Sequence, residues 1–162
     1  MPTSPLPRDV ILRRALSSDA SALAAVYRSS VTVYGADGYD AEQVRIWAQS
    51  ADRLEACICP KGFTLLAEVA GEAACFGRLF PDDHIDLLYC APPHGRRGLA
   101  SAVLAALEAE AQRRGAASLT VEASLVARGI FEKHGYQVVA EERVDLRGAL
   151  FRRFRMAKGV AP

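Results

Sequence analysis

The apolar positions at the start of the chain predict a short strand followed by a helix. Val10 to Arg13 has the apolar content of a strand. Ser17-Ser18-Asp19 comes next and supplies side chains that favour a helix N-cap, so we expect a helix to begin there. The apolar face of that helix recurs at steps of three and four residues and comprises Leu23, Val26, Tyr27 and Val31.

A second helix is predicted directly after the glycine-containing stretch YGADGYD. Asp40 followed by Gln43 has the pattern of a capping box, in which the two residues satisfy each other's backbone N–H groups. The residues that share one face of this helix are Val44, Trp47 and Ala48.

Three strands are predicted in the middle of the chain. Phe63 to Glu68 and Ala74 to Phe80 are apolar runs on either side of a turn around Ala70-Gly71-Glu72, which indicates an antiparallel hairpin. His84 to Cys90 supplies a third strand.

The second half of the chain predicts a long helix and then a mixture of short elements. Leu99 to Arg114 has apolar residues at four-residue steps and ends at Gly115, a residue typical of helix C-termini. We expect a strand over Ser118 to Glu122, a helix over Leu125 to Lys133, and strands over Tyr136 to Glu141 and Leu150 to Met156. The order βααβββαβαββ predicts one α/β domain with a mixed sheet over residues 9–158, after a loose, proline-rich lead-in at residues 1–8.

Composition and charge narrow the classes of protein. The chain has 162 residues, 51% of them hydrophobic, which is enough for one packed domain and excludes a disordered tail. The net charge of +1 provides no overall field for nucleic acid. The N-terminal MPTSPLPRD lacks the apolar region of a signal peptide, and no window approaches the roughly 18 apolar residues of a membrane span. We therefore expect a cytoplasmic protein without nucleic-acid or membrane partners. The local cluster Arg152, Arg153 and Arg155 is interpreted as the solvated edge of a sheet.

The cysteines favour reduced thiols over a metal site. They lie at positions 57, 59, 75 and 90. The C-x-C pair matches neither a redox C-x-x-C motif nor a pair of zinc knuckles. A site joining Cys57 and Cys59 to His84 and His94 is the alternative, but their spacing does not support it. We predict no metal.

The stretch YCAPPHGRRGLASAVLAALEAEAQRRG has the features of a phosphate-binding loop. The start of the predicted helix leaves backbone N–H groups unpaired, and these donors and the helix dipole suit a phosphate. Gly95 and Gly98 allow close approach, and Arg96 and Arg97 add donors. Neither a Walker loop nor a dinucleotide G-x-G-x-x-G motif is present, so ATP and NAD are poor candidates and another pyrophosphate is favoured.

These residues resemble the GNAT N-acetyltransferases. LYCAPPHGRRGLA is similar to their acetyl-CoA motif, Q/R-x-x-G-x-G/A, with Gly98 and Ala100 at its last small positions and Gly95 where Gln or Arg is usual. LTVEASLVARGIFEKHGYQVV is similar to the second motif of the family, and the early helix pair and the hairpin LLAEVAGEAACFGRL also match its order. The resemblance covers nearly the whole chain.

The resemblance implies a fold and a cofactor site. The fold would be a mixed, mostly antiparallel sheet, flanked by about four helices and splayed beside the strand that ends near Tyr89. The pantetheine arm of acetyl-CoA would lie along that strand edge, where backbone N–H groups near residues 88–90 would polarise the thioester. The implied cofactor residues are Leu88, Tyr89, Cys90, Gly95, Arg96, Arg97, Gly98, Leu99, Ala100, Ser101, Ser124 and Phe131.

The implied activity is transfer of an acetyl group from acetyl-CoA to a primary amine by direct attack. An amine that is protonated near neutral pH needs a base, and Asp86 and Glu122 are the two candidates. Many members of the family carry, at the place of Phe131, a tyrosine that can protonate the departing thiolate. This chain would use Tyr89 or Tyr136 instead, use water, or release the thiolate unaided.

The acceptor and the alternatives to an enzyme stay open at this stage. Tyr39 and Trp47 are candidates for an acceptor pocket, although an aromatic on an amphipathic helix is more often part of the core. The acceptor would be a small-molecule or peptide amine, and the sequence leaves a homodimer open. The alternative is a catalytically silent acyl-CoA-binding sensor or assembly module. A nucleic-acid binder is weaker, because the net charge of +1 does not match the local arginine cluster.

Overall fold

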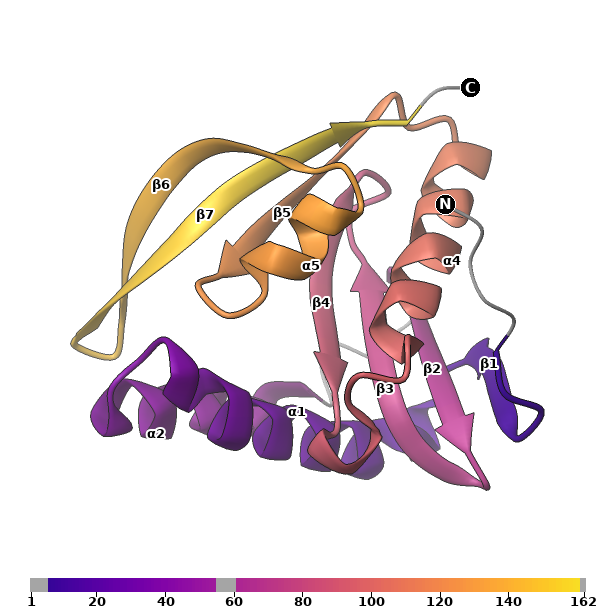
Figure 1. Cartoon of the computed structure of the whole chain (residues 1–162), viewed down its shortest axis with the longest axis horizontal. Coiled ribbons are helices and arrows are strands. Elements are labelled where there is room, and N and C mark those ends of the chain that lie inside the picture. Colours follow the sequence, from indigo (N-terminus) through magenta and orange to yellow (C-terminus); the bar gives the residue numbers. More distant parts are fainter. Residues whose placement is uncertain (1–5, 55–60, 161–162) are drawn as a thin grey trace.

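A computed structural model describes residues 6–54 and 61–160. Within them the strands form one sheet in the order β1-β2-β3-β4-β5-β7-β6 (Figure 1). The strands are β1 Val10–Arg14, β2 Phe63–Val69, β3 Glu72–Leu79, β4 His84–Cys90, β5 Ser118–Ser124, β6 Gln137–Leu146 and β7 Ala149–Gly159.

Helices cover both faces of this sheet, in the predicted α/β order. The α-helices are α1 Ala20–Tyr34, α2 Ala41–Gln49, α4 Leu99–Arg113 and α5 Arg128–Lys133. Short 3-10 turns lie at η1 Ser17–Asp19, η2 Gly35–Asp37, η3 Ser50–Arg53 and η4 Pro92–His94. No helix within the described residues is long and apolar enough to cross a membrane.

The sheet opens between β4 and β5, as predicted. These two strands are parallel and pair at two positions, His84 with Thr120 and Ile85 with Val121. Beyond that point they diverge, and Figure 1 shows β5 running away from β4 toward the long β6–β7 hairpin. The remaining strand pairs are antiparallel. The opening is therefore bordered by the carboxyl-terminal halves of β4 and β5.

Two layers of apolar side chains fix the helices on the sheet. One cluster joins α4 to the sheet, and its helix side chains are almost fully buried. A second cluster joins α1 to the opposite face, with Leu23 and Val26 packed near Leu66 and Phe76. The buried residues of α4 are Leu99, Val103, Leu104, Leu107 and Ala111.

Gly77 of β3 is a point of close approach between α4 and the sheet. A Cβ at this position would lie 2.8 Å from Cδ1 of Leu107 and 3.0 Å from Cγ1 of Val103. We expect Gly77→Ala to lower the free energy of unfolding by about 1–3 kcal/mol in urea titrations, because overpacking forces the helix away. Gly159→Ala is the control, since a Cβ there has no atom within 4 Å. Equal losses in the two variants would contradict this account of the interface.

Both α1 and α2 begin where predicted, with Asp19 and Asp40 as their N-cap residues, but only α2 has a side-chain cap. Asp19 makes no side-chain capping bond to α1. Its two carboxylate oxygens instead accept hydrogen bonds from Nη1 and Nη2 of Arg13, each at 2.8 Å. The predicted cap is wrong because this ion pair engages the carboxylate. At α2, Asp40 and Gln43 form the expected capping box, with both hydrogen bonds at 2.8 Å.

The arginines near the end of the chain do not lie at a sheet edge, so that prediction is wrong. They are on β7, which lies between β5 and β6. The β6–β7 hairpin is longer than predicted and places glutamates of β6 beside the arginines. The ion pairs are Arg152 with Glu141, Arg153 with Glu142, and Arg155 with Glu142.

The helix predicted from Leu125 begins at Arg128, three residues later. The residues before it form a turn, in which the N–H of Ala127 donates to the side-chain oxygen of Ser124 at 3.1 Å. This turn brings the end of β5 to the opening between β4 and β5.

Candidate active site

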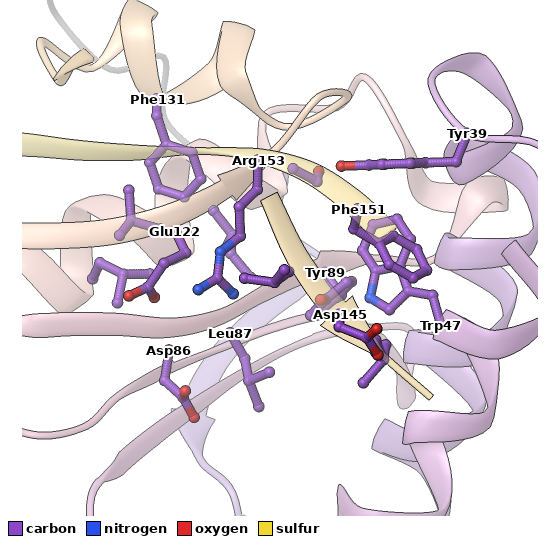
Figure 2. Close-up of a pocket in the computed structure, with 16 residues that line it drawn as sticks. Tyr39, Trp47, Asp86, Leu87, Tyr89, Glu122, Phe131, Asp145, Phe151 and Arg153 are labelled. Atoms are coloured by element: carbon purple, nitrogen blue, oxygen red, sulfur yellow. The ribbon is translucent and has the colours of Figure 1, made fainter. Parts of the chain in front are cut away.

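Two cavities meet at the opening between β4 and β5. We call the one of about 750 Å³ beside residues 95–101 the loop cavity, and the one of about 390 Å³ beneath the β6–β7 hairpin the sheet cavity. Figure 2 shows the sheet cavity. The residues that line both cavities are Trp47, Leu88, Tyr89 and Ser124. A ligand in one cavity can therefore reach a ligand in the other at this junction.

The edge of β4 presents backbone groups to the junction. The N–H of Ala91 donates to the carbonyl of Ala74 on β3 at 2.8 Å. Because residues of an antiparallel strand bond to the same neighbour at alternate positions, Tyr89 also faces β3, whereas Leu88 and Cys90 direct their N–H and C=O groups away from it. These groups face the gap where β5 has diverged, so they can bind an extended ligand.

The loop before α4 presents backbone donors to the loop cavity. Arg96 and Gly98 have positive φ angles of 62° and 79°, which turn the chain into the helix. The N–H of Ala102 donates to the carbonyl of Gly98 at 3.0 Å. The N–H groups of residues 99–101 precede this bond and are the unpaired donors of the helix start.

Most of the predicted cofactor residues line the loop cavity. Arg97 is exposed and does not line it. Phe131 lines the sheet cavity instead. Those that line the loop cavity are Leu88, Tyr89, Cys90, Gly95, Arg96, Gly98, Leu99, Ala100, Ser101 and Ser124.

Tyr34 explains the glycine at position 95, and sequence reasoning missed it. A Cβ at Gly95 would lie 2.1 Å from the hydroxyl oxygen of Tyr34, so a side chain there would force the Tyr34 ring to move. Tyr34 is the last residue of α1 and lines the loop cavity. Burial raises the pKa of its hydroxyl, and the nearby charge of Arg96 opposes that rise. The hydroxyl thus occupies the place where the family usually has a Gln or Arg side chain.

The two cavities differ in charge. In the part of the chain that the structure describes, Arg96 and Lys133 are the charged residues of the loop cavity, and both are cations. The sheet cavity has three carboxylates and one guanidinium, those of Asp86, Glu122, Asp145 and Arg153. The loop cavity suits an anionic ligand and the sheet cavity suits a ligand that carries a cation.

The two predicted bases have different partners. Asp86 accepts a hydrogen bond from Nη1 of Arg78 at 2.9 Å, and Arg78 is 7% exposed. Glu122 contacts Nε2 of His84 at 2.8 Å, while Nδ1 of His84 lies 2.7 Å from the hydroxyl of Thr120. Asp86 is thus held in an ion pair with a buried cation, whereas Glu122 is linked to a group that can exchange a proton.

Aromatic rings form one wall of the sheet cavity. The rings of Tyr39 and Trp47 have centroids 5.5 Å apart, and Tyr39 is also 5.5 Å from Phe151. The Tyr39 hydroxyl donates to the carbonyl of Arg152 at 2.6 Å and accepts from the N–H of Leu125 at 3.1 Å. These two bonds fix the hydroxyl against β7 and the turn that follows β5. Tyr39 and Trp47 therefore line a cavity and also pack against neighbouring aromatic rings. Both interpretations of their sequence pattern, a pocket wall and part of the core, apply.

Of the two tyrosines proposed as substitutes for an acid at Phe131, Tyr89 lines both cavities. Burial raises the pKa of its hydroxyl well above the usual value. Tyr136 lines neither of these cavities, and its ring meets that of Phe131 edge-on with centroids 5.2 Å apart. The position of Tyr136 therefore does not favour it as the acid.

The predicted absence of a metal is not tested across the whole chain. Cys57 and Cys59 lie outside the described residues, and the residues that are described contain no cluster of metal-binding side chains. Cys75 and Cys90, which face each other on β3 and β4, are free thiols.

Sequence comparison identifies the family of this fold and site. A family model for the acetyltransferase (GNAT) domain matches residues 35–158. The uncharacterized N-acetyltransferase YafP of Escherichia coli (strain K12) is 31% identical over 149 residues, which are 91% of this chain and 95% of that protein. The chain belongs to the GNAT family and is an acetyl-CoA-dependent acyltransferase.

Solved structures confirm the GNAT fold. A GCN5-related N-acetyltransferase from Rhodopseudomonas palustris, also described as a class-II aminotransferase, is 33% identical, with a TM-score of 0.90 over 98% of this chain and 100% of that one. The PaiA N-acetyltransferase from Thermoplasma acidophilum, solved in complex with coenzyme A, is 18% identical, with a TM-score of 0.74 over 93% of this chain and 99% of that one.

Proposed function

We propose that the protein transfers an acetyl group from acetyl-CoA directly to a primary amine of a small molecule or peptide. The observation that carries the proposal is the junction at Leu88 and Tyr89, where a cationic cavity meets one rich in carboxylates. An anionic acetyl donor and a cationic acceptor could then occupy one continuous opening. The reaction would need no covalent enzyme intermediate.

The loop cavity would hold acetyl-CoA. Its phosphates would lie at the unpaired N–H groups of residues 99–101, near Arg96 and Lys133. The PaiA structure with coenzyme A shows that a protein of this fold holds such a ligand. The outward N–H groups of Leu88 and Cys90 would bind the pantetheine arm and the thioester oxygen.

Glu122 would act as the base for the acceptor. It lies on the sheet-cavity side of the junction, and His84 behind it can take up the proton. Asp86 lines the same cavity, but its carboxylate is already held by a hydrogen bond from the buried Arg78 and is therefore less free to contact the acceptor amine. We therefore favour Glu122 over Asp86.

The departing thiolate needs little help from an acid. A thiol has a pKa of about 8.5, so its anion is a tolerable leaving group near neutral pH. Tyr89 carries the phenolic hydroxyl among the residues that line both cavities, so it is the candidate proton donor. We infer that an acid is optional, and that Phe131 packs near the reacting groups without taking part.

Phe131→Tyr tests whether an acid matters. We expect acetyl-CoA affinity to stay the same and turnover to change by no more than about tenfold, which is below the range of about 10²- to 10⁴-fold typical of general acid catalysis. Steady-state thiol release with a working amine measures this. A wild type that acetylates no amine, combined with an active Phe131→Tyr, would overturn the optional acid and favour the sensor.

Ligand binding followed by thiol release tests the function itself. Acetyl-CoA should raise the melting temperature of the protein, whereas NAD and ATP should not, because a ligand that binds the folded state stabilises it. Thiol release should then depend on the presence of an amine from a panel of small molecules and peptides. Binding of acetyl-CoA without transfer to any amine would support the catalytically silent module instead.

A further inference from the structure

The sheet cavity contains a guanidinium that the proposed reaction does not use. Arg153 lies on β7, is half-buried, and extends into the cavity on the side of Glu122 (Figure 2). Among the described residues its guanidinium makes one hydrogen bond and ion pair, from Nε to Oε2 of Glu142 at 3.0 Å, and Glu142 shares its charge with Arg155. This bond orients the side chain and leaves the Nη1 and Nη2 groups free to bind an anion.

The carboxylates of the cavity do not neutralise this cation by direct contact. Asp86 pairs with Arg78, and Oδ1 of Asp145 accepts the N–H of Gly148 at 2.9 Å. Glu122 contacts His84 through Oε2. In the described part of the chain, no ion pair joins Arg153 to any of these three carboxylates.

If the acceptor were a simple alkylammonium, the Arg153 guanidinium would not contribute to its binding. A guanidinium with free donors would repel a positively charged acceptor, and like charges brought together weaken binding. The conflict disappears if the acceptor also carries an anion, because Arg153 then binds that anion while Glu122 receives the amine. A carboxylate fits, since its two oxygens match the paired donors of a guanidinium.

The strand register gives the spacing between these two charges. Ser124 pairs with Arg153 and Glu122 pairs with Arg155 across β5 and β7. Arg153 and Glu122 are therefore diagonal neighbours on adjacent strands, with Cα atoms about 7–8 Å apart. Long side chains converging from such positions suit a ligand whose amine and carboxylate are separated by only one or a few carbons.

The aromatic wall completes the description of the acceptor. Tyr39, Trp47 and Phe151 line the same cavity as Arg153. We propose that the acceptor is an amino carboxylate with an apolar or aromatic body, and that Arg153 binds its carboxylate. This inference rests on the proposed function and names the class of substrate.

The test compares three amines that differ at the carboxylate: L-phenylalanine, L-phenylalaninamide and phenethylamine. The quantity measured is the ratio of kcat/KM for the acid to that for the amide. We expect Arg153→Gln to lower this ratio about tenfold or more relative to wild type, because a charge-assisted, paired contact is lost. Because the same ratio is compared between wild type and variant, differences in basicity among the amines cancel.

Arg152→Gln is the matched control. Arg152 is the next residue on β7, is exposed, and pairs with Glu141 through Nε at 2.7 Å, but it does not line the cavity. Its ratio should equal that of wild type. Arg153→Lys keeps the charge without the paired donors and should fall between wild type and Arg153→Gln. Equal ratios in all four proteins would overturn the inference.

Binding measurements separate this inference from the proposed function. Trp47 is the one tryptophan of the chain and lines the cavity, so its fluorescence reports acceptor binding in the presence of coenzyme A. Binding of phenylalanine that is lost in Arg153→Gln, without acetylation of any amine, would support the carboxylate site and contradict the transfer activity. Acetylation of phenethylamine with no binding of phenylalanine would uphold the activity and overturn the carboxylate site.

Discussion

Gly98→Val is expected to abolish most of the binding of acetyl-CoA. Gly98 precedes α4 with a φ of 79°, and a Cβ there would meet no protein atom within 4 Å, so the added atoms would occupy space in the loop cavity. A branched side chain would hold the phosphates away from the N–H groups of residues 99–101. Isothermal titration with acetyl-CoA should show a loss of affinity of at least about 10²-fold, equivalent to about 2.7 kcal/mol.

Gly115→Val separates this effect from strain in the backbone. Gly115 lies just after the other end of α4, has a φ of 90°, and also has no atom within 4 Å of a Cβ. Both variants carry a side chain in the left-handed region, so both should lose stability by about 1–2 kcal/mol or more. Acetyl-CoA affinity should fall in Gly98→Val alone. Unchanged affinity in a folded Gly98→Val would remove this loop from the cofactor site.

Glu122→Gln is expected to lower kcat/KM for the amine by about 10²-fold or more near neutral pH, the range of general base catalysis. The amide keeps the shape of the side chain and can still contact His84, but it accepts no proton. Acetyl-CoA affinity should not change. Because an alkylamine loses its own proton at high pH, with a pKa of about 10.4, the deficit should shrink as the pH rises toward about 9.5.

Asp86→Asn is the matched comparison for the second carboxylate. Its amide oxygen can still accept from Arg78, so we expect kcat/KM to fall by less than about tenfold, well below the loss expected for a general base. The pH profiles of thiol release by Glu122→Gln and Asp86→Asn show which carboxylate acts as the base. A small loss in Glu122→Gln together with a large loss in Asp86→Asn would assign the base to Asp86.

Features encoded in short stretches of sequence could be predicted. The loop before α4, the hairpin between β2 and β3, and the capping box at Asp40 and Gln43 each depend on residues close in the chain. The opening between β4 and β5 was also expected, but from the resemblance to a family rather than from periodicity. Local patterns and motif order together therefore gave the fold and most of the loop cavity.

Features that depend on distant residues could not be predicted. Tyr34 fills the space beside Gly95 because α1 ends at the loop before α4, and no local pattern links these two positions. Asp19 was expected to cap α1, but Arg13 from β1 binds its carboxylate. The sequence pattern alone does not show whether the Asp19 carboxylate binds the N-terminus of α1 or the Arg13 guanidinium.

Arg153 shows how sheet order changes the interpretation of one residue. Alternating arginines predict a solvated edge, but β7 lies between two other strands. The long β6–β7 hairpin supplies Glu142, which orients Arg153, and brings the guanidinium into the sheet cavity. The sequence contains both residues, but their register is set by the turn at Arg147 and Gly148, whose φ angles are 50° and 88°.

The central claim is that one opening holds the acetyl donor and the acceptor together. Initial-velocity kinetics, in which the concentrations of both substrates are varied, test this claim most directly. Cys90 lines the loop cavity as a free thiol, so an acetyl-enzyme is the competing mechanism. Direct transfer within a ternary complex predicts that double-reciprocal lines for different acceptor concentrations intersect. Parallel lines, the pattern of a ping-pong mechanism with an acetylated enzyme, would contradict the account.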